Sequence, residues 1–132
     1  PELFPNVREV LDTLYNRGCV LAIASSRLSE SLMLFMREHK IDGYFSYVVG
    51  ADSVTKHKPD AEPVLQTLRE LGVVASEVMV VGDMPVDILM ARNAGARNVG
   101  VTWGNASREE LEAACADHII DNIEQLLTLV AE

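Results

Sequence analysis

Short apolar runs alternate along the chain with longer stretches in which apolar residues recur at helical spacing. Residues 7–14 show this helical spacing behind a capping-box pattern of Asn6 and Glu9, and they predict a first helix. The continuous apolar run at residues 19–24 has the length of a strand and ends abruptly at small polar residues. A helix followed by a strand is therefore the first unit of the pattern.

The same alternation continues to the end of the sequence. Further strands are expected at residues 47–49, 78–81, 98–102 and 118–120. Further helices are expected to begin near Ser29, Pro59, Pro85, Ser107 and Ile123. Strands that alternate with helices predict an α/β fold, namely a three-layer Rossmann-like parallel sheet with helices on both faces. No repeat, linker or low-complexity segment interrupts the pattern, so residues 1–132 are expected to form one core domain.

The stretch from residue 78 to residue 95 combines a buried strand, a sharp turn and a helix. Gly82 follows the apolar run, and Pro85 suits the first turn of the helix. Asp83 and Asp87, four residues apart, place two carboxylates near one strand end and one helix N-terminus. Oxygen ligands of this kind suit a hard cation, although an Asp in these places can also cap the helix or favour its dipole. Both interpretations stay open at this point.

Composition and charge narrow the range of partners. The 132 residues carry a net charge of −9 without a cluster of Lys and Arg, which argues against a nucleic-acid-binding surface. No apolar stretch approaches the ~18 residues of a membrane span, and the N-terminal residues do not form a signal peptide, so a cytoplasmic protein without membrane contact is expected. Cys19 and Cys115 lack metal-ligand spacing and are expected to be buried free thiols.

Single polar residues stand where other strands are predicted to end. Parallel strands end at one edge of a sheet, and ligands of open α/β sheets bind outside that edge. Ser25 and Ser26 offer hydroxyl and amide donors for a phosphate oxygen there, although serine is also common in ordinary turns. Lys58, held in an extended backbone by Pro59, can neutralise a phosphoryl group or restrain nearby carboxylates, and its alternative role is solvation. Trp103 follows another strand, where packing is its safer interpretation.

Taken together, these motifs resemble those of the haloacid dehalogenase-like hydrolase superfamily, most closely its phosphoglycolate phosphatase-like branch. Ser25 ends VLAIAS and matches the second family motif, Lys58 in KPDAEP matches the third, and Asp83 and Asp87 in GDMPVD match the fourth. The segment GVTWGNASREELEAACADHIID is also similar to the phosphatase branch.

The resemblance implies a Mg²⁺-dependent hydrolase of small phosphate monoesters that works through an aspartyl-phosphate intermediate. Asp83 and Asp87 would be the metal residues, and Ser25, Ser26 and Lys58 would bind the phosphoryl group of a small phosphorylated metabolite. Lys58 and Asp83 would also take part in catalysis. The resemblance carries no signal for an oligomeric state. A phosphosugar mutase of the same superfamily and a non-catalytic phosphate- or Mg²⁺-binding module are the alternatives.

The first family motif, Asp-X-Asp, is absent from the sequence. In the family this motif supplies the nucleophile at the end of the first strand and precedes the cap. The resemblance therefore implies a fragment that begins where the cap ends, lacks the first central strand and is inactive alone. Two partial sheets with unpaired edges are expected, one containing the strand that ends at Ser25 and the other the strand that ends at Asp83.

Overall fold

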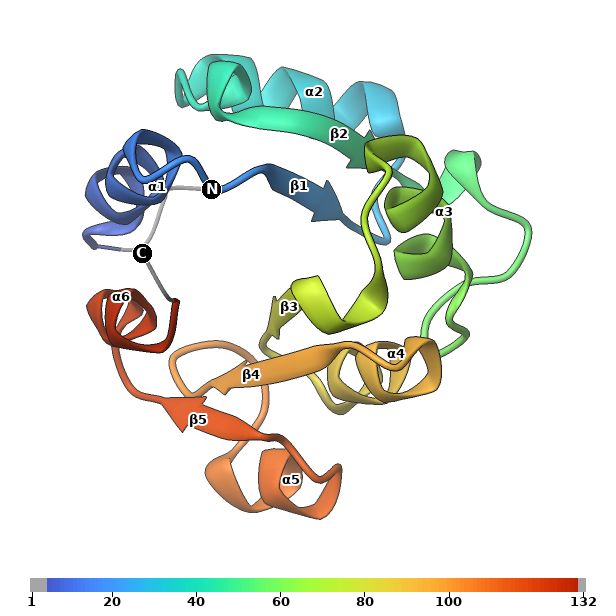
Figure 1. The fold of residues 1–132 in the computed structure, drawn as a ribbon, viewed down its shortest axis with the longest axis vertical. Coiled ribbons are helices and arrows are strands. Elements are labelled where there is room, and N and C mark those ends of the chain that lie inside the picture. Colours follow the sequence, from blue (N-terminus) through green and yellow to red (C-terminus); the bar gives the residue numbers. More distant parts are fainter. Residues whose placement is uncertain (1–4, 131–132) are drawn as a thin grey trace. The chain divides into compact units, whose positions relative to one another are not determined.

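The structure is a computed structural model in which residues 5–130 are described. The chain divides into two compact units, whose α-helices and strands are labelled in Figure 1. The first unit contains the residues up to Ser53 together with those from Ile123 onward, and the second contains Val54–Asn122. Each unit is described by itself.

The first unit is built on two parallel strands, β1 (Leu21–Ala24) and β2 (Phe45–Val49). Its helical elements, in chain order, are α1 (Val7–Asn16), α2 (Ser29–Glu38), η1 (Asp42–Tyr44), η2 (Ala51–Ser53), η4 (Ile123–Gln125) and α6 (Leu126–Leu129). The predicted first helix and first strand are confirmed, and the next strand begins two residues earlier than expected. Apolar side chains of α2 form the core of this unit, because Leu32 and Met36 lie on one helix face and are buried with Ile41.

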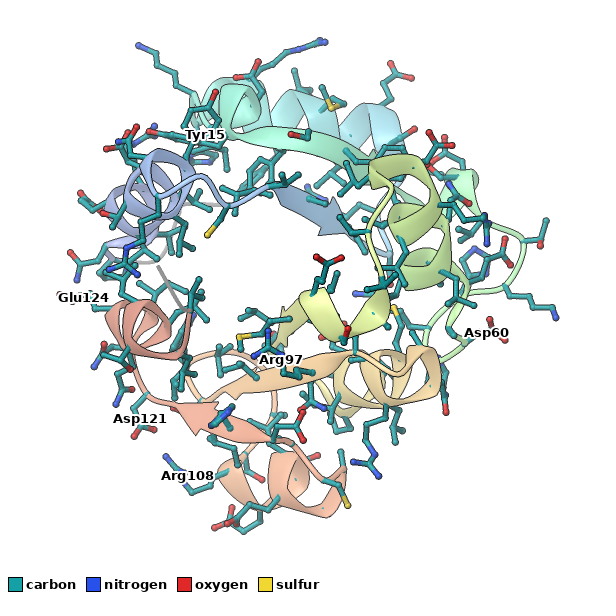
Figure 2. All side chains as sticks on the ribbon, viewed as in Figure 1. Tyr15, Asp60, Arg97, Arg108, Asp121 and Glu124 are labelled. Atoms are coloured by element: carbon teal, nitrogen blue, oxygen red, sulfur yellow. The ribbon has the colours of Figure 1, made fainter. Side chains whose placement is uncertain are left out.

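The start of α1 differs from the prediction. Asn6 has a left-handed φ of 66°, and its side chain makes no capping hydrogen bond. The Asn6 amide instead donates to Oε1 of Glu124, which is labelled in Figure 2, at 2.8 Å. Arg17 donates to the Leu127 carbonyl oxygen at 3.0 Å. The predicted capping box is therefore wrong, because the Asn6 side chain is used to hold the C-terminal helical segment against α1.

The loop that follows β2 fixes the start of α2. The Ser29 amide and hydroxyl both donate to the Asp52 carboxylate, at 2.7 Å and 2.6 Å. The hydrogen bond from the hydroxyl is the main cause that lowers the pKa of Asp52. Gly50 permits this approach, because a Cβ at position 50 would lie only 2.8 Å from the Ser29 Cα.

The second unit contains three parallel strands in the order β3-β4-β5. These strands are β3 (Met79–Gly82), β4 (Arg97–Val101) and β5 (His118–Ile120). The helical elements of the unit are α3 (Glu62–Leu71), η3 (Ala75–Glu77), α4 (Pro85–Ala94) and α5 (Arg108–Ala113). Gly82 at the end of β3 lies opposite Gly100 of β4, so these two strands end side by side. The predicted order of strands and helices is confirmed.

The central strand of this unit, β4, is more deeply buried than its neighbour β3. Residues 98–101 of β4 are all buried, as expected of a strand covered on both faces. The residues of β3 are only half-buried or exposed, and Val81 is 40% exposed. The prediction of a buried strand over residues 78–81 is therefore wrong, because β3 has a strand neighbour on one edge alone among the described residues.

The expectation of two partial sheets is confirmed. Within residues 5–130, β1 pairs only with β2 and β3 pairs only with β4. An unpaired edge exposes backbone donors and acceptors together with the apolar residues beside them. Val20, directly before β1, is 59% exposed, which matches the exposure of Val81 on β3.

The ends of the later helices follow their local sequence closely. Ser107 and Glu110 form the capping box of α5, with the Ser107 amide donating to Glu110 at 2.9 Å and the Glu110 amide donating to Ser107 at 3.2 Å.

Both cysteines are free, but Cys19 is half-buried and Cys115 is exposed. The expectation that both thiols are buried is wrong, since Cys115 lies where the chain turns away from α5 with a φ of 66°. Among residues 5–130, every helix is too short or too polar to cross a membrane.

Candidate functional site

The turn from β3 into α4 positions Asp87. Met84 is extended, with φ −129° and ψ 151°, and Pro85 begins the helix, which places Asp87 in its first turn. Asp87 Oδ2 accepts a hydrogen bond from the Met84 amide at 3.2 Å, so this carboxylate does cap the helix. Asp87 is nevertheless only 6% exposed, which is unusual for an aspartate that serves as a cap alone.

Gly82 makes room for the buried carboxylate. A Cβ on Gly82 would lie 2.6 Å from Asp87 Oδ2, closer than any real Cβ contact. The glycine at the end of β3 therefore lets the Asp87 side chain pack directly against the strand backbone. The glycine of the Gly-Asp turn is thus needed for the packing of Asp87 as well as for the turn of the chain.

Lys58 supplies the counter-charge to Asp87. The Lys58 Nζ lies 2.6 Å from Asp87 Oδ1, and the two side chains are 17% and 8% exposed. This is a charge-assisted hydrogen bond between largely buried groups, in which each charge lowers the cost of burying the other. The structure thus brings together two residues that are 29 positions apart in the sequence.

The loop that carries Lys58 is held in place by its own hydrogen bonds. The Glu62 carboxylate accepts from the Thr55 amide at 3.2 Å and from the Lys56 amide at 2.9 Å. The Thr55 amide is the main cause that lowers the pKa of Glu62. On the other side, the Asn93 amide of α4 donates to the Pro59 carbonyl oxygen at 2.9 Å. These bonds restrict the backbone on both sides of Lys58.

Asp83 has a different environment from Asp87. It is half-buried, and its Oδ2 accepts two hydrogen bonds from Asn105, from the backbone amide at 3.2 Å and from the side-chain amide at 3.1 Å. A Cβ on Gly104 would lie 2.8 Å from the Asp83 Cγ, so the loop after β4 touches this carboxylate directly. Sequence reasoning missed Asn105 and Gly104 as site residues. The available signals were the position of Gly104 two residues after a predicted strand end and the inclusion of both residues in the segment similar to the phosphatase branch.

Ser25 and Ser26 belong to the first unit, at the end of β1. The Ser25 amide donates to the Val49 carbonyl oxygen at 2.9 Å, and Ser25 Oγ accepts from the Arg27 amide at 3.1 Å. The Ser25 amide is therefore used in strand pairing, and its hydroxyl takes part in the kind of turn that was the alternative interpretation. The hydroxyl still has its own proton to donate, since it acts as an acceptor towards Arg27. The structure thus places Lys58, Asp83 and Asp87 in one unit and both serines in the other.

Comparison with known proteins identifies the family of the chain. Residues 1–101 match the family of haloacid dehalogenase-like hydrolases. The chain belongs to this family. The family match includes Ser25, Lys58, Asp83 and Asp87, the residues of the three motifs found in the sequence.

Individual relatives of the chain have three kinds of name. The chain is 37% identical over 125 residues to a protein of Caldanaerobacter subterraneus that is provisionally named as the pyrophosphatase PpaX. It is 33% identical over 129 residues to a phosphoglycolate phosphatase of Vibrio parahaemolyticus. These alignments cover 95% and 98% of the chain. A crystal structure from Thermotoga maritima, provisionally named as a beta-phosphoglucomutase, superposes with a TM-score of 0.89 at 29% identity over 97% of the chain.

The chain is shorter than these relatives. It spans 57% of the length of both curated relatives and 61% of the Thermotoga maritima chain. The high TM-score confirms the predicted Rossmann-like α/β fold. All three names refer to phosphate compounds, but each name refers to a different compound.

Asp83 and Asp87 differ in how readily their oxygens could bind a metal ion. Among residues 5–130, no group of three or more His, Cys, Asp or Glu side chains is arranged to hold a metal. Mg²⁺, however, is typically bound through one or two carboxylates together with waters and substrate phosphates. Asp83 fits this role, because Oδ1 makes no hydrogen bond within the described part of the chain. Asp87 fits less directly, because Lys58 occupies Oδ1 and the Met84 amide occupies Oδ2.

Proposed function

We propose that the protein containing this chain is a Mg²⁺-dependent phosphatase that hydrolyses small phosphate monoesters through an aspartyl-phosphate intermediate. The observation that carries the proposal is the buried ion pair of Lys58 and Asp87 next to Asp83, at the turn between β3 and α4. This set lies within the part of the chain that matches a family of hydrolases. A relative with 33% identity is named a phosphoglycolate phosphatase, which supports a small phosphorylated metabolite as the substrate.

Each residue has a separate task in this proposal. Asp83 would be a direct ligand of Mg²⁺, and Asp87 would orient its water shell while it holds Lys58. Mg²⁺ supplies positive charge that neutralises the phosphoryl oxygens. The Lys58 ammonium adds a second positive charge in a chain whose net charge is −9. The Ser25 hydroxyl and the Ser26 amide would donate to the phosphoryl oxygens. Positioning and charge neutralisation of this kind are most of what phosphoryl transfer requires.

The nucleophile of the proposed reaction is not among these 132 residues. The sequence contains no Asp-X-Asp, the motif that supplies the phosphoryl-accepting aspartate in the resemblance described above. The absence of this motif is also the observation that favours the second candidate, a phosphate- or Mg²⁺-binding module without catalysis. A phosphosugar mutase is the third candidate, favoured by the similarity to the Thermotoga maritima structure.

Hydrolysis of p-nitrophenyl phosphate with Mg²⁺ tests the proposal. We expect no turnover from the 132-residue chain and clear turnover from the protein at its natural length. Asp83→Asn should reduce kcat about 100-fold or more, the usual cost of losing a group that stabilises transferring charge. Asp42→Asn, which alters an exposed carboxylate of η1, is the matched control and should leave kcat unchanged.

The outcomes separate the three candidates. Turnover by the 132-residue chain would contradict our account of the nucleophile. Binding of Mg²⁺ or phosphate without turnover at natural length would support the non-catalytic module. Isomerisation of a sugar phosphate without release of inorganic phosphate would support the mutase.

A further inference from the structure

We infer that Asn105 is a positioning residue that turns one oxygen of Asp83 toward a divalent cation. The inference rests on the proposed function, in which Asp83 is a metal ligand. Asn105 donates twice to the same atom, since its backbone amide and its side-chain amide lie 3.2 Å and 3.1 Å from Asp83 Oδ2. Asn105 lies in the segment GVTWGNASREELEAACADHIID, but the resemblance assigns it no role.

The two hydrogen bonds make the oxygens of Asp83 unequal. A carboxylate oxygen has two lone-pair directions, and two N–H donors occupy both of them on Oδ2. Oδ1 makes no hydrogen bond within the described part of the chain, so it is the oxygen left for a cation. Asn105 thereby favours a cation bound through one oxygen over one that both oxygens share.

The backbone around Asn105 is held on both sides. Gly104 lies so close to Asp83 that a Cβ at this position would be 2.8 Å from the Asp83 Cγ. Ala106 is only 6% exposed and is buried in one cluster with Ile88 of α4. Asn105 is therefore fixed between a glycine that touches the carboxylate and an alanine in the core.

A second set of hydrogen bonds fixes the two ends of the same loop. Asp121 Oδ1 accepts from the Thr102 hydroxyl at 2.8 Å and from Arg108 Nη2 at 2.7 Å. Asp121 and Arg108 are labelled in Figure 2. The bond from Thr102 is the main cause that lowers the pKa of Asp121. The loop from β4 to α5 is thus tied to the end of β5 at its first residue, Thr102, and at the first residue of α5, Arg108. A rigid loop lets Asn105 hold one orientation of the Asp83 carboxylate instead of following it.

Metal binding by Asn105→Ala tests this inference. The substitution removes the side-chain donor and keeps the backbone amide, and Asn105 is exposed, so no core contact is lost. We expect the Kd for Mn²⁺, measured by electron paramagnetic resonance on the natural-length protein, to rise about 10-fold, the usual effect of losing an outer hydrogen bond to a metal ligand. The Mg²⁺ concentration for half-maximal turnover should rise by a similar factor, while KM for the phosphate ester and kcat at saturating Mg²⁺ stay close to wild type.

Asn16→Ala is the matched control. Asn16 is also exposed and also donates its side-chain amide to an aspartate, Asp12 Oδ2, at 3.2 Å. This variant loses an equivalent hydrogen bond far along the sequence from Asp83 and should bind Mn²⁺ like wild type. Asn105→Ser, which keeps a shorter donor, should recover part of the lost affinity and provides a second variant if Asn105→Ala folds poorly.

Unchanged Mn²⁺ affinity in Asn105→Ala would overturn the inference. The proposed function would survive that result if Asp83→Asn still reduced kcat about 100-fold or more. A wild-type protein that binds neither Mn²⁺ nor Mg²⁺ would overturn the inference and the metal-dependent function together. A loss of kcat in Asn105→Ala that saturating Mg²⁺ does not restore would also contradict a role limited to positioning the metal ligand.

Discussion

Lys58→Met should destabilise the protein, because it leaves a buried carboxylate without its counter-charge. In the wild type, Lys58 Nζ and Asp87 Oδ1 are 2.6 Å apart and the side chains are 17% and 8% exposed. Methionine preserves the length and the apolar stem of the lysine, so the change removes the ammonium with little loss of packing. After the substitution, the Met84 amide at 3.2 Å is the remaining hydrogen bond that the structure shows to Asp87.

The size of the effect follows from the geometry. At a separation of 2.6 Å the attraction between the two charges is about 6 kcal/mol for an effective dielectric constant of ~20, before the cost of desolvation is subtracted. Removing one partner of a buried pair costs about 3–5 kcal/mol in measured cases. We expect the free energy of unfolding to fall by about 3 kcal/mol, near the lower end of this range. The reason is that the exposed part of Lys58 lies where water can enter and solvate Asp87.

Urea unfolding of four proteins measures the effect. Lys58→Met, Asp87→Asn and the double variant form a cycle with wild type, and the double variant should be less destabilised than the sum of the two single changes by at least about 1 kcal/mol. Lys56→Met alters an exposed lysine of the same loop and should change stability by less than about 0.5 kcal/mol. If Lys58→Met is as stable as Lys56→Met, or if the cycle shows no coupling, the pair does not hold the buried carboxylate.

Two further predictions concern packing and pH. Gly82→Ala should destabilise the protein by about 1–3 kcal/mol in thermal unfolding, because its Cβ would lie 2.6 Å from Asp87 Oδ2, whereas Gly43→Ala, where nothing lies within 4 Å, should be tolerated. Equal stability of the two variants would contradict the packing argument. The pKa of Asp52 is lowered in the folded state, chiefly by the Ser29 hydroxyl. The stability that this group contributes is therefore present above its unfolded pKa and is lost as pH falls through the folded pKa. Ser29→Ala should therefore lose less stability than wild type between about pH 5 and pH 2, and parallel pH profiles from urea unfolding would refute this.

The order of helices and strands was predictable because each element buries one face and therefore leaves a periodic pattern. The capping box of Ser107 and Glu110 formed as predicted, since both partners lie within one helical turn and no distant residue competes for them. Lys58, Asp83 and Asp87 were identified by their positions at predicted strand ends. The pairing of Lys58 with Asp87 was the less predictable part, because it depends on how a loop crosses the turn after β3.

Three of the misses share one physical cause, which is a partner far away in the sequence. Asn6 has the local pattern of a helix cap, but its amide bonds Glu124, 118 positions away. Val81 has the local pattern of a buried strand, but its exposure depends on how many neighbours β3 has. Asn105 lies in a polar loop where local rules predict only solvation, and its contact with Asp83 arises because β3 and β4 end side by side.

Asp83 and Asp87 show how the fold separates two groups that the sequence presents as a pair. By type and spacing they are equivalent carboxylates, and two adjacent negative charges would repel each other. The structure gives Asp87 a buried position and the Lys58 ammonium, so its charge is already compensated. Asp83 receives only neutral amide donors from Asn105, so its charge is not compensated by these contacts. A divalent cation that enters this site would therefore gain most from Asp83, and the ion pair next to it would limit the total negative charge that the cation has to balance.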